Sequence, residues 1–397
     1  MRETADLVVV GAGTIGGWAS WFARTDGVGR VIVLERGLAG QGASSRAAGV
    51  VRQQGGVPET VRLGRFSVEF YRSQPDRLGT DSGFRELGYV VLALDDADVA
   101  AAEERMAMQR AEGLDVRWLT AEAARALVPS LAPDIIRGGT YVSSDGCIDP
   151  PRNVRAYSLA MQAAGVELRE RTPFLGLLTE PSGDGRRVVG VETPTGPIAT
   201  SRVLLTGGPT LAEVGRVAGI RIPVGAARHS VAVTEPHPAF EDPQPMLFDL
   251  RAGLYWRLEE GGLLFGWSDP DERPGEARAV DLDALTAWRS RLARYVPLTA
   301  GLGLRKVWAA TIDYTTDHLP VLGPGLDDAG APIEGLWVAS AAGHGMMWGP
   351  GIARVAADLA LRGRTELIDI RRLGLDRFDA EGRSRQAADP IALPFPQ

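Results

Sequence analysis

The sequence predicts an α/β fold in which one sheet is parallel and a second sheet is mainly antiparallel. Residues 7–35 are typical of a strand, a glycine turn, a helix and a second strand. Residues 222–313 instead contain short apolar runs, two of which flank the hairpin signal Glu259-Glu260-Gly261. Near the end of the chain, an apolar strand over 336–339 is followed by a glycine loop and a helix to about 362. These three observations define the predicted architecture.

The first turn has the composition of a dinucleotide-binding loop. The run Leu7–Val10 is apolar and β-branched, as expected of a strand buried on both faces. Gly11, Gly13 and Gly16 follow in G-x-G-x-x-G spacing. These glycines permit the tight turn, the approach of a pyrophosphate to the backbone and close packing of helix on strand, while the helix N-terminus attracts the phosphates.

The second strand, Val31–Leu34, ends in an acidic residue, Glu35. Its distance from the glycines suits a carboxylate that binds the ribose hydroxyls, and its charge disfavours the 2′-phosphate of NADP. The motif does not distinguish NAD from FAD. A glycine turn in an ordinary α/β domain is the alternative interpretation.

The remaining elements are predicted from hydrophobic periodicity and from start and stop signals. Thr120 is predicted to cap a short helix that stops before Pro129. The other predicted helices span 58–75, 96–112, 151–164 and 281–295. The predicted strands span 89–94, 166–168, 188–193, 196–198, 203–205, 231–234, 254–258, 262–267 and 304–310.

The composition is that of an ordinary globular protein. Of 397 residues, 45% are hydrophobic and 23% charged, with a net charge of −7. No basic block indicates nucleic-acid binding, and no apolar run has the length of a membrane span. Because a signal-peptide pattern is also missing, we expect a soluble, cytoplasmic protein. The single cysteine, Cys147, and four scattered histidines give no basis for a metal site.

The chain resembles the FAD-dependent D-amino-acid oxidase and sarcosine oxidase family, which includes glycine oxidase-like proteins. Glu35-Arg36 is followed by a small-residue stretch over 42–49 with the pattern G-x-S-S-x-x-x-A/G-G. Residues 315–323 are similar to the family's T-x-D-x-x-P-x-x-G signature, and residues 343–345 to its G-H-G loop. The resemblance covers nearly the whole chain.

The resemblance implies two discontinuous domains. A Rossmann-like FAD-binding domain would comprise residues 1–85, 145–220 and 315–375. A substrate-binding domain, built on a large, mainly antiparallel sheet that roofs the flavin, would comprise residues 86–144 and 221–314. Residues 376–397 would form a C-terminal tail.

The resemblance also implies the residues that hold FAD. The expected FAD-binding residues are Gly11, Gly13, Thr14, Ile15, Gly16, Glu35, Arg36, Gly42, Ala43, Ser44, Ser45, Arg46, Gly49, Val50, Phe174, Thr206, Gly207, Gly208, Gly343, His344, Gly345, Met346 and Met347. Some relatives attach the flavin to a cysteine or histidine, but this chain has neither at 309–311 nor near Arg46. We therefore expect FAD to be bound non-covalently.

The family oxidises the C–N bond of amino acids or N-substituted amino acids to an imine by hydride transfer to flavin. Arg52 matches a carboxylate-binding arginine, and its guanidinium suits a carboxylate. Tyr255 and Trp256 are neighbours in one strand, so only one of them should line the pocket. The expected catalytic residues are Arg52, His344 and Tyr255, and the expected substrate contacts are Arg52, Tyr255, Trp256, Met347 and Trp348.

The electron acceptor is left open by the sequence. Two lysines of the sarcosine oxidase site correspond to about Leu264 and to Met347, and Lys306 is the only lysine in the chain. A nearby cation stabilises superoxide, so its loss weakens the case for O2 and favours a dehydrogenase that passes electrons to a quinone or protein partner. A flavin hydroxylase and a non-catalytic FAD-binding scaffold are further alternatives, and the chain is compatible with an oligomer.

Overall fold

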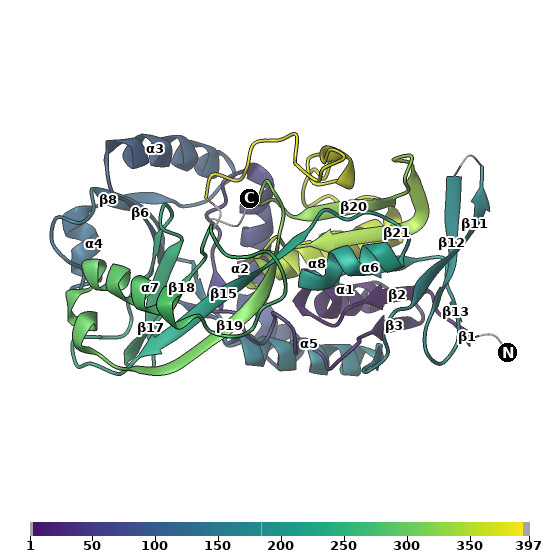
Figure 1. The fold of residues 1–397 in the computed structure, drawn as a ribbon, viewed down its shortest axis with the longest axis horizontal. Helices are drawn as coiled ribbons and strands as arrows, with labels where there is room; N and C mark the ends of the chain where they lie inside the picture. Colours follow the sequence, from purple (N-terminus) through teal and green to yellow (C-terminus); the bar gives the residue numbers. More distant parts are fainter. Residues whose placement is uncertain (1–2, 184, 392–397) are drawn as a thin grey trace.

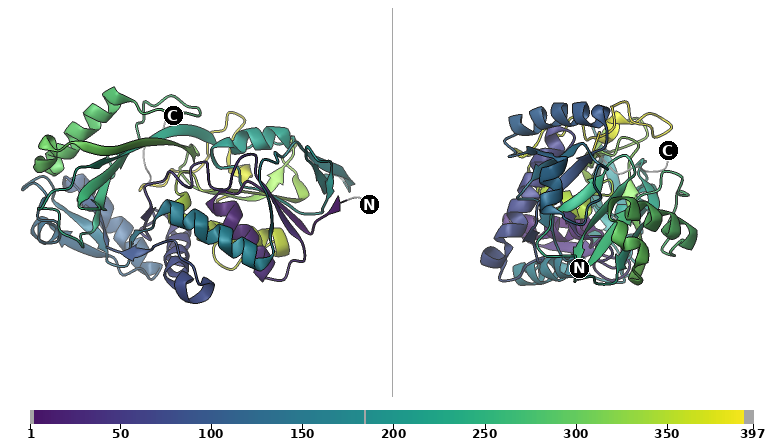
Figure 2. Two further views of the ribbon diagram at one scale, coloured as in Figure 1. Left: turned by 90° about the horizontal axis from the view of Figure 1, so that it is seen from below. Right: turned by 90° about the vertical axis from the view of Figure 1, so that its left-hand side faces the viewer.

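The computed structural model describes residues 3–183 and 185–391. The strands of these residues form a ten-stranded, an eight-stranded and a three-stranded sheet. Figure 1 shows the first sheet at one end of an elongated molecule and the second at the other end, and the left-hand view of Figure 2 shows the same division from below. The fold is therefore α/β, with one sheet at each end.

The centre of the ten-stranded sheet is parallel, in the order β21-β14-β2-β3-β10. Strands β2, β3 and β14 have the predicted bounds. The strands of this sheet are β1 (Glu3–Thr4), β2 (Leu7–Val10), β3 (Val31–Leu34), β10 (Glu167–Arg169), β11 (Gly176–Ser182), β12 (Gly185–Glu192), β13 (Ile198–Ala199), β14 (Val203–Leu205), β20 (Val321–Leu326) and β21 (Pro332–Ser340).

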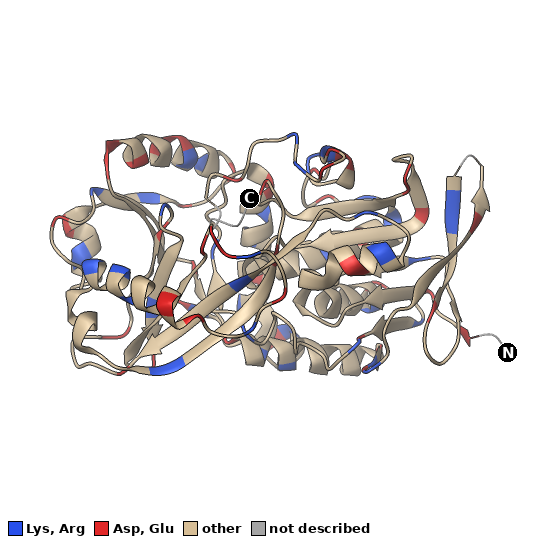
Figure 3. Cartoon of the chain, in the orientation of Figure 1, with Lys and Arg blue, Asp and Glu red and all other residues tan. Residues whose placement is uncertain are grey.

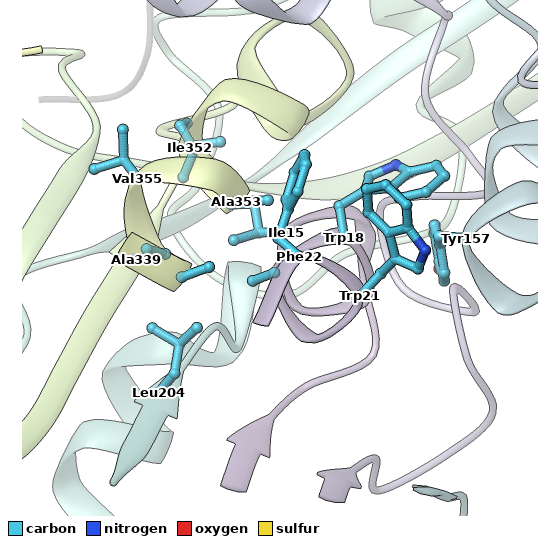
Figure 4. Close-up of a cluster of buried hydrophobic side chains, with 14 of the residues drawn as sticks. Ile15, Trp18, Trp21, Phe22, Tyr157, Leu204, Ala339, Ile352, Ala353 and Val355 are labelled. Atoms are coloured by element: carbon cyan, nitrogen blue, oxygen red, sulfur yellow. The ribbon is translucent and has the colours of Figure 1, made fainter. Parts of the chain in front are cut away.

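Strand β2 is buried on both faces, as its composition predicts. Leu7 and Val9 belong to one hydrophobic cluster, whereas Val8 and Val10 belong to another. The first cluster includes side chains of four helices, and Figure 4 shows its aromatic centre around Trp18. This packing fixes the first helix against the carboxyl end of β2.

Of the eight α-helices in the described residues, seven correspond to predicted helices, whereas α6 was not predicted. The Thr120 hydroxyl accepts a hydrogen bond from the Ala123 amide at 3.1 Å, which confirms the predicted cap. The helices are α1 (Thr14–Thr25), α2 (Pro58–Leu78), α3 (Asp96–Ala111), α4 (Ala121–Leu127), α5 (Pro150–Ala164), α6 (Leu211–Val217), α7 (Leu282–Tyr295) and α8 (Gly345–Arg362). The short 3₁₀ segments are η1 (Gly208–Thr210), η2 (Pro297–Gly301) and η3 (Leu375–Arg377).

The eight-stranded sheet has the order β19-β15-β18-β17-β16-β6-β8-β7, and only its β16–β6 pair is parallel. Its strands are β6 (Tyr89–Ala93), β7 (Arg117–Thr120), β8 (Gly138–Val142), β15 (Gly225–Thr234), β16 (Met246–Asp249), β17 (Leu254–Glu259), β18 (Gly262–Trp267) and β19 (Leu304–Tyr314). Glu260 and Gly261 have positive φ angles of 49° and 77°, as the hairpin requires. One face of the eight-stranded sheet packs on α7, and its opposite face is turned toward the end of the molecule that holds the parallel sheet.

Several elements are longer than predicted or were missed. Helix α2 continues to Leu78, beyond the predicted end at 75, because Gly79 ends it in the left-handed conformation. Strand β19 continues to Tyr314, since it pairs with β15 along its whole length. Strands β11, β16 and β20 were not predicted. The three short strands of the three-stranded sheet were not predicted either: β4 (Val50–Val51), β9 (Gly146–Cys147) and β5 (Arg85–Glu86).

The charged side chains of both signs are interspersed over the two ends of the molecule (Figure 3). Within residues 3–183 and 185–391, no helix is both long and apolar enough to cross a membrane. In the same part of the chain, no group of three or more histidine, cysteine, aspartate or glutamate side chains is arranged to hold a metal ion.

Candidate active site

A long cavity runs from the carboxyl ends of β2, β3 and β14 to the inner face of the eight-stranded sheet. Many separate stretches of the sequence contribute to its wall. Twenty of the 23 residues expected to bind FAD line it: Gly11, Gly13, Thr14, Ile15, Glu35, Arg36, Gly42, Ala43, Ser44, Gly49, Val50, Phe174, Thr206, Gly207, Gly208, Gly343, His344, Gly345, Met346 and Met347. Carboxyl ends of parallel strands are where α/β sheets bind nucleotides.

The glycine turn is shaped by contacts that a larger residue would break. Gly11 has a φ of 100°, which L side chains rarely adopt. A Cβ atom at Gly16 would lie 1.9 Å from the carbonyl oxygen of Gly11. Gly16 is thus needed for the packing of α1 on β2 and does not itself line the cavity. Gly13 precedes α1, whose N-terminal end faces the cavity and carries a positive dipole.

The Glu35 carboxylate stands at the end of β3, beside this turn. It accepts hydrogen bonds from the backbone amides of Ala12 at 2.9 Å and Gly37 at 2.7 Å. Each carboxylate oxygen has a second acceptor site, so both can still accept ribose hydroxyls. Next to it, Arg36 faces Glu213 and Glu276 at 3.8 and 3.6 Å, and all three side chains are about half exposed.

A second helix N-terminus enters the cavity from the opposite side. The loop before α8 has positive φ angles at Ala342 (47°) and Gly343 (85°), and no side chain caps the helix. Pro350, in the second turn, has no N–H to donate to the Met346 carbonyl, which instead accepts from the Tyr71 hydroxyl at 2.9 Å. Helix α2 therefore supports the start of α8, and the amides there point toward the cavity.

His344 is buried at this loop with one ring nitrogen bonded and the other free. Its Nδ1 lies 2.8 Å from the carbonyl oxygen of Ala342, so Nδ1 carries the proton and donates it. Its Nε2 has no hydrogen-bond partner among the described residues. Burial lowers the pKa of His344 to about 3. The side chain is a neutral acceptor in the cavity wall.

Arg52 lies at the end of the cavity away from the glycine turn, and one of its nitrogen donors has no partner among the described residues. It is 2% exposed and lies between the rings of Tyr89 and Phe248, with its Cζ 5.7 and 5.4 Å from their centroids. Its Nη2 donates to the backbone carbonyl of Ile391 at 2.9 Å, and its Nε contacts the sulfur of Met347 at 3.5 Å. Its Nη1 is buried and has no partner among the described residues.

The inner face of the eight-stranded sheet contributes a hydrogen-bonded chain of three side chains. The Tyr255 hydroxyl lies 2.7 Å from His229 Nε2, and His229 Nδ1 lies 3.0 Å from the Ser268 hydroxyl. All three are buried, and burial lowers the pKa of His229 to about 4 while raising that of Tyr255. Tyr255 and His229 line the cavity.

Five of the predicted site residues do not line the cavity. Trp256 points to the opposite face of its sheet, where it packs with α7 residues, as the alternation along β17 requires. Trp348 is fully buried beneath His344, with the two rings 4.2 Å apart. Gly16, Ser45 and Arg46 are also outside the wall, and the Arg46 carbonyl accepts from the Trp308 indole at 2.8 Å.

Sequence reasoning missed several wall residues, among them His229, Tyr89 and Phe248 at the inner face of the eight-stranded sheet. His229 had a usable signal, because it shares a face with Val231 and Val233 in β15, two positions apart along the strand. That periodicity marks the inner face. Nothing local distinguishes Tyr89 and Phe248 from core residues.

Comparison with known proteins identifies the family. A model described as "FAD dependent oxidoreductase" matches residues 6–359. The chain belongs to the FAD-dependent oxidoreductase family. This agrees with the resemblance drawn from the glycine motif and the G-H-G loop.

The relatives of this FAD-dependent oxidoreductase include a dehydrogenase and an oxidase subunit. It is 26% identical over 381 residues to the mitochondrial dimethylglycine dehydrogenase of Rattus norvegicus, covering 91% of this chain and 43% of that protein. It is 25% identical to the sarcosine oxidase subunit beta of an Arthrobacter species, covering 85% of this chain and 82% of that one. The chain thus spans less than half the length of the dehydrogenase relative.

Solved structures show the same fold. Glycine oxidase from Geobacillus kaustophilus superposes with a TM-score of 0.80 at 26% identity, covering 95% of this chain and all of that chain. L-proline dehydrogenase from P. horikoshii superposes with a TM-score of 0.83 at 24% identity, covering 92% and 96%.

The cavity of this chain fits FAD. The two helix N-termini, at Gly13 and Gly345, place backbone amides at two separate points of one cavity. The Glu35 carboxylate lies near the first, where a ribose follows a pyrophosphate. The unpartnered Nε2 of His344 lies near the second. A dinucleotide with a redox-active ring needs all of these features in one continuous space.

Proposed function

We propose that this enzyme oxidises the C–N bond of an amino acid or N-substituted amino acid to an imine. The observation that carries the proposal is Arg52, a side chain of the cavity wall whose buried Nη1 has no partner among the described residues. A buried, unpaired cationic donor costs free energy unless an anion pairs with it. A substrate carboxylate supplies that anion.

FAD, when bound, accepts the hydride that leaves the carbon next to the amine. The residues of this chain bind and orient the substrate. Arg52 Nη1 holds the carboxylate. The Tyr255 hydroxyl and His344 Nε2 are the nearby polar groups that can accept an N–H of the amine. After oxidation, water hydrolyses the imine.

The surroundings favour the neutral amine that this reaction requires. Met346, Met347, Tyr89 and Phe248 give the cavity an apolar wall, which disfavours an ammonium ion. His344 and Tyr255 are uncharged at neutral pH, so neither stabilises a positive charge by ion pairing. The ammonium proton is therefore released to water as the substrate binds.

The final electron acceptor is O2 or an electron-accepting partner. Among the described residues, the cationic side chains in the cavity wall are Arg36, Arg52 and Arg278. Leu264, where the sequence resemblance places an oxygen-activating lysine, is a buried leucine in β18. This observation favours a dehydrogenase that passes electrons to a quinone or protein as the second candidate.

We also propose that FAD is bound non-covalently and that the protein works in the cytoplasm. Ala309 and Ala310 offer no nucleophile, and the only cysteine, Cys147, is buried outside the cavity wall. An unpaired cysteine suits a reducing compartment. Acid precipitation of the purified protein should release all of its flavin, and flavin retained on the precipitate would contradict non-covalent binding.

The test is anaerobic reduction of the bound flavin by matched pairs of compounds. Sarcosine, glycine and L-proline are each compared with the amine that lacks the carboxylate: dimethylamine, methylamine and pyrrolidine. D-amino acids and larger N-methyl amino acids extend the series. The proposal expects the flavin absorbance to bleach with at least one acid and not with its amine partner. Reoxidation after admitting air then separates oxidase from dehydrogenase, and no bleaching by any amino acid would overturn the proposal.

A further inference from the structure

The segment Asp389–Ile391, 337 or more positions after Arg52 in the sequence, meets the substrate end of the cavity. The backbone carbonyl of Ile391 accepts from Arg52 Nη2 at 2.9 Å. The Ile391 side chain is fully buried in the cluster that includes Tyr89 and Phe248, the two rings on either side of the guanidinium. In Figure 1, the yellow end of the chain crosses from the parallel-sheet end to the middle of the molecule.

Asp389 holds this segment in place through contacts within the segment and to two other parts of the chain. Its backbone amide donates to the Asp317 carbonyl at 2.9 Å. Its carboxylate accepts from the Ile391 amide at 2.9 Å and from the Thr60 hydroxyl, at the start of α2, at 3.4 Å. The Asp389 side chain is buried, and a Cβ atom at Gly56 would lie 1.9 Å from its Oδ1.

Asp317 also anchors the chain that leads to this segment. Its carboxylate forms a buried ion pair with Arg377, with an Nε–Oδ2 distance of 2.7 Å. The chain between Arg377 and Asp389 is therefore fixed at both ends, and the position of the Ile391 carbonyl depends on Asp389.

We propose that Asp389 is a positioning residue for the substrate carboxylate, because it holds the Ile391 carbonyl against Arg52 Nη2 and leaves Nη1 as the donor that faces the substrate. This inference rests on the proposed function. A guanidinium has five N–H donors in a rigid plane. Fixing one edge of that plane with a backbone carbonyl fixes the direction of the remaining donors. Without the contact, Arg52 turns away from the productive orientation.

The experiment uses the FAD-loaded enzyme and three variants of the full chain. Asp389→Ala removes the acceptor, and Asp389→Asn keeps an acceptor oxygen of the same shape. Gly56→Ala pushes on the carboxylate from the neighbouring loop. Arg385→Ala is the matched control, since Arg385 lies four residues before Asp389, its side chain is exposed, and among the described residues that side chain bonds only to the Asp376 carbonyl.

Two readouts are measured: the Kd of acetate from its perturbation of the flavin absorbance, and KM and kcat for an amino acid and its decarboxylated partner. Asp389→Ala and Gly56→Ala should each raise the acetate Kd and the amino-acid KM at least tenfold, with flavin content and the amine reaction unchanged. Asp389→Asn and Arg385→Ala should stay within twofold of the parent enzyme.

The outcomes separate this inference from the proposed function. If the parent enzyme binds acetate and prefers amino acids, but Asp389→Ala and Gly56→Ala keep both properties, the positioning role is wrong. Equal losses toward the acid and the amine, or an Asp389→Asn variant as impaired as Asp389→Ala, would also overturn it. If the parent enzyme neither binds acetate nor oxidises amino acids, the proposed function itself fails.

Discussion

The two ends of the cavity are built in different ways. At the parallel-sheet end, three of the groups proposed to bind the dinucleotide, Gly11, Gly13 and Glu35, lie within one strand-turn-helix-strand unit. At the other end, Arg52, His229 and Tyr255 come from three distant parts of the chain. Under the proposed function, the first end recognises its ligand mainly through backbone and steric fit, and the second through individual side chains. Substitutions should therefore act differently at the two ends.

The largest effect is expected at Gly16. A methyl group there would lie 1.9 Å from the Gly11 carbonyl, and neither backbone can move without separating α1 from β2. Gly16→Ala should cost about 3 kcal/mol or more of unfolding free energy and abolish flavin binding. Thermal unfolding and the flavin-to-protein absorbance ratio measure both. Gly301→Ala, where a Cβ meets no atom within 4 Å, is the control. A Gly16→Ala protein with full flavin content would contradict this account of the turn.

The next effect is expected at Arg52. Arg52→Gln removes the buried cation, so kcat/KM for an amino acid should fall about 300-fold, equivalent to roughly 3 kcal/mol for a lost charge-assisted contact. The reaction of the decarboxylated amine should not fall. Arg85→Gln is a suitable control, because Arg85 is half exposed and pairs with Asp242. Equal losses for both compounds would show that Arg52 does not select the carboxylate.

The same contrast explains how far the sequence could predict the molecule. Strands 7–10, 31–34 and 203–205 were predicted to the residue, since buried parallel strands are continuous apolar runs bounded by glycines. The hairpin at 254–267 was predicted from its turn. The meeting of Arg52 with Ile391 could not be predicted, because it depends on the path of a segment without regular hydrophobic periodicity. The sequence showed that only one of Tyr255 and Trp256 should line the cavity, but it did not show which one. The packing of the sheet decides this, because the two side chains belong to clusters on opposite faces.

A smaller effect is expected in the pH dependence of stability. Burial lowers the pKa of His229 from 6.5 to about 4. Between these values the unfolded chain binds a proton that the folded protein does not, so this group's contribution to stability is full above pH 6.5 and is lost as the pH falls toward 4. From pH 7 to pH 5 the loss is about 2 kcal/mol. Urea unfolding of His229→Asn should show a correspondingly smaller decrease between pH 7 and pH 5 than the parent protein does, and an identical decrease would contradict the assignment of a neutral histidine.

The smallest effect is expected at Tyr255, and it tests whether single side chains define the roof end of the cavity. The Tyr255 hydroxyl bonds to His229 Nε2 and faces the cavity. Tyr255→Phe keeps the ring but removes the group proposed to orient the amine, so kcat/KM should fall about tenfold, equivalent to roughly 1.4 kcal/mol for one neutral hydrogen bond. Flavin content and the acetate Kd should stay unchanged, because FAD and the carboxylate are held elsewhere.

Ser268→Ala provides the comparison for this prediction, since Ser268 bonds to the far nitrogen of the same histidine and does not line the cavity. If the hydrogen-bonded side chains Tyr255, His229 and Ser268 act only by fixing the histidine tautomer, Ser268→Ala and Tyr255→Phe should impair the reaction equally. If the Tyr255 hydroxyl itself contacts the amine, as proposed, Ser268→Ala should change kcat/KM less than twofold. A Tyr255→Phe enzyme with parental kcat/KM would remove Tyr255 from the proposed catalytic residues and leave His344 Nε2 as the acceptor for the amine.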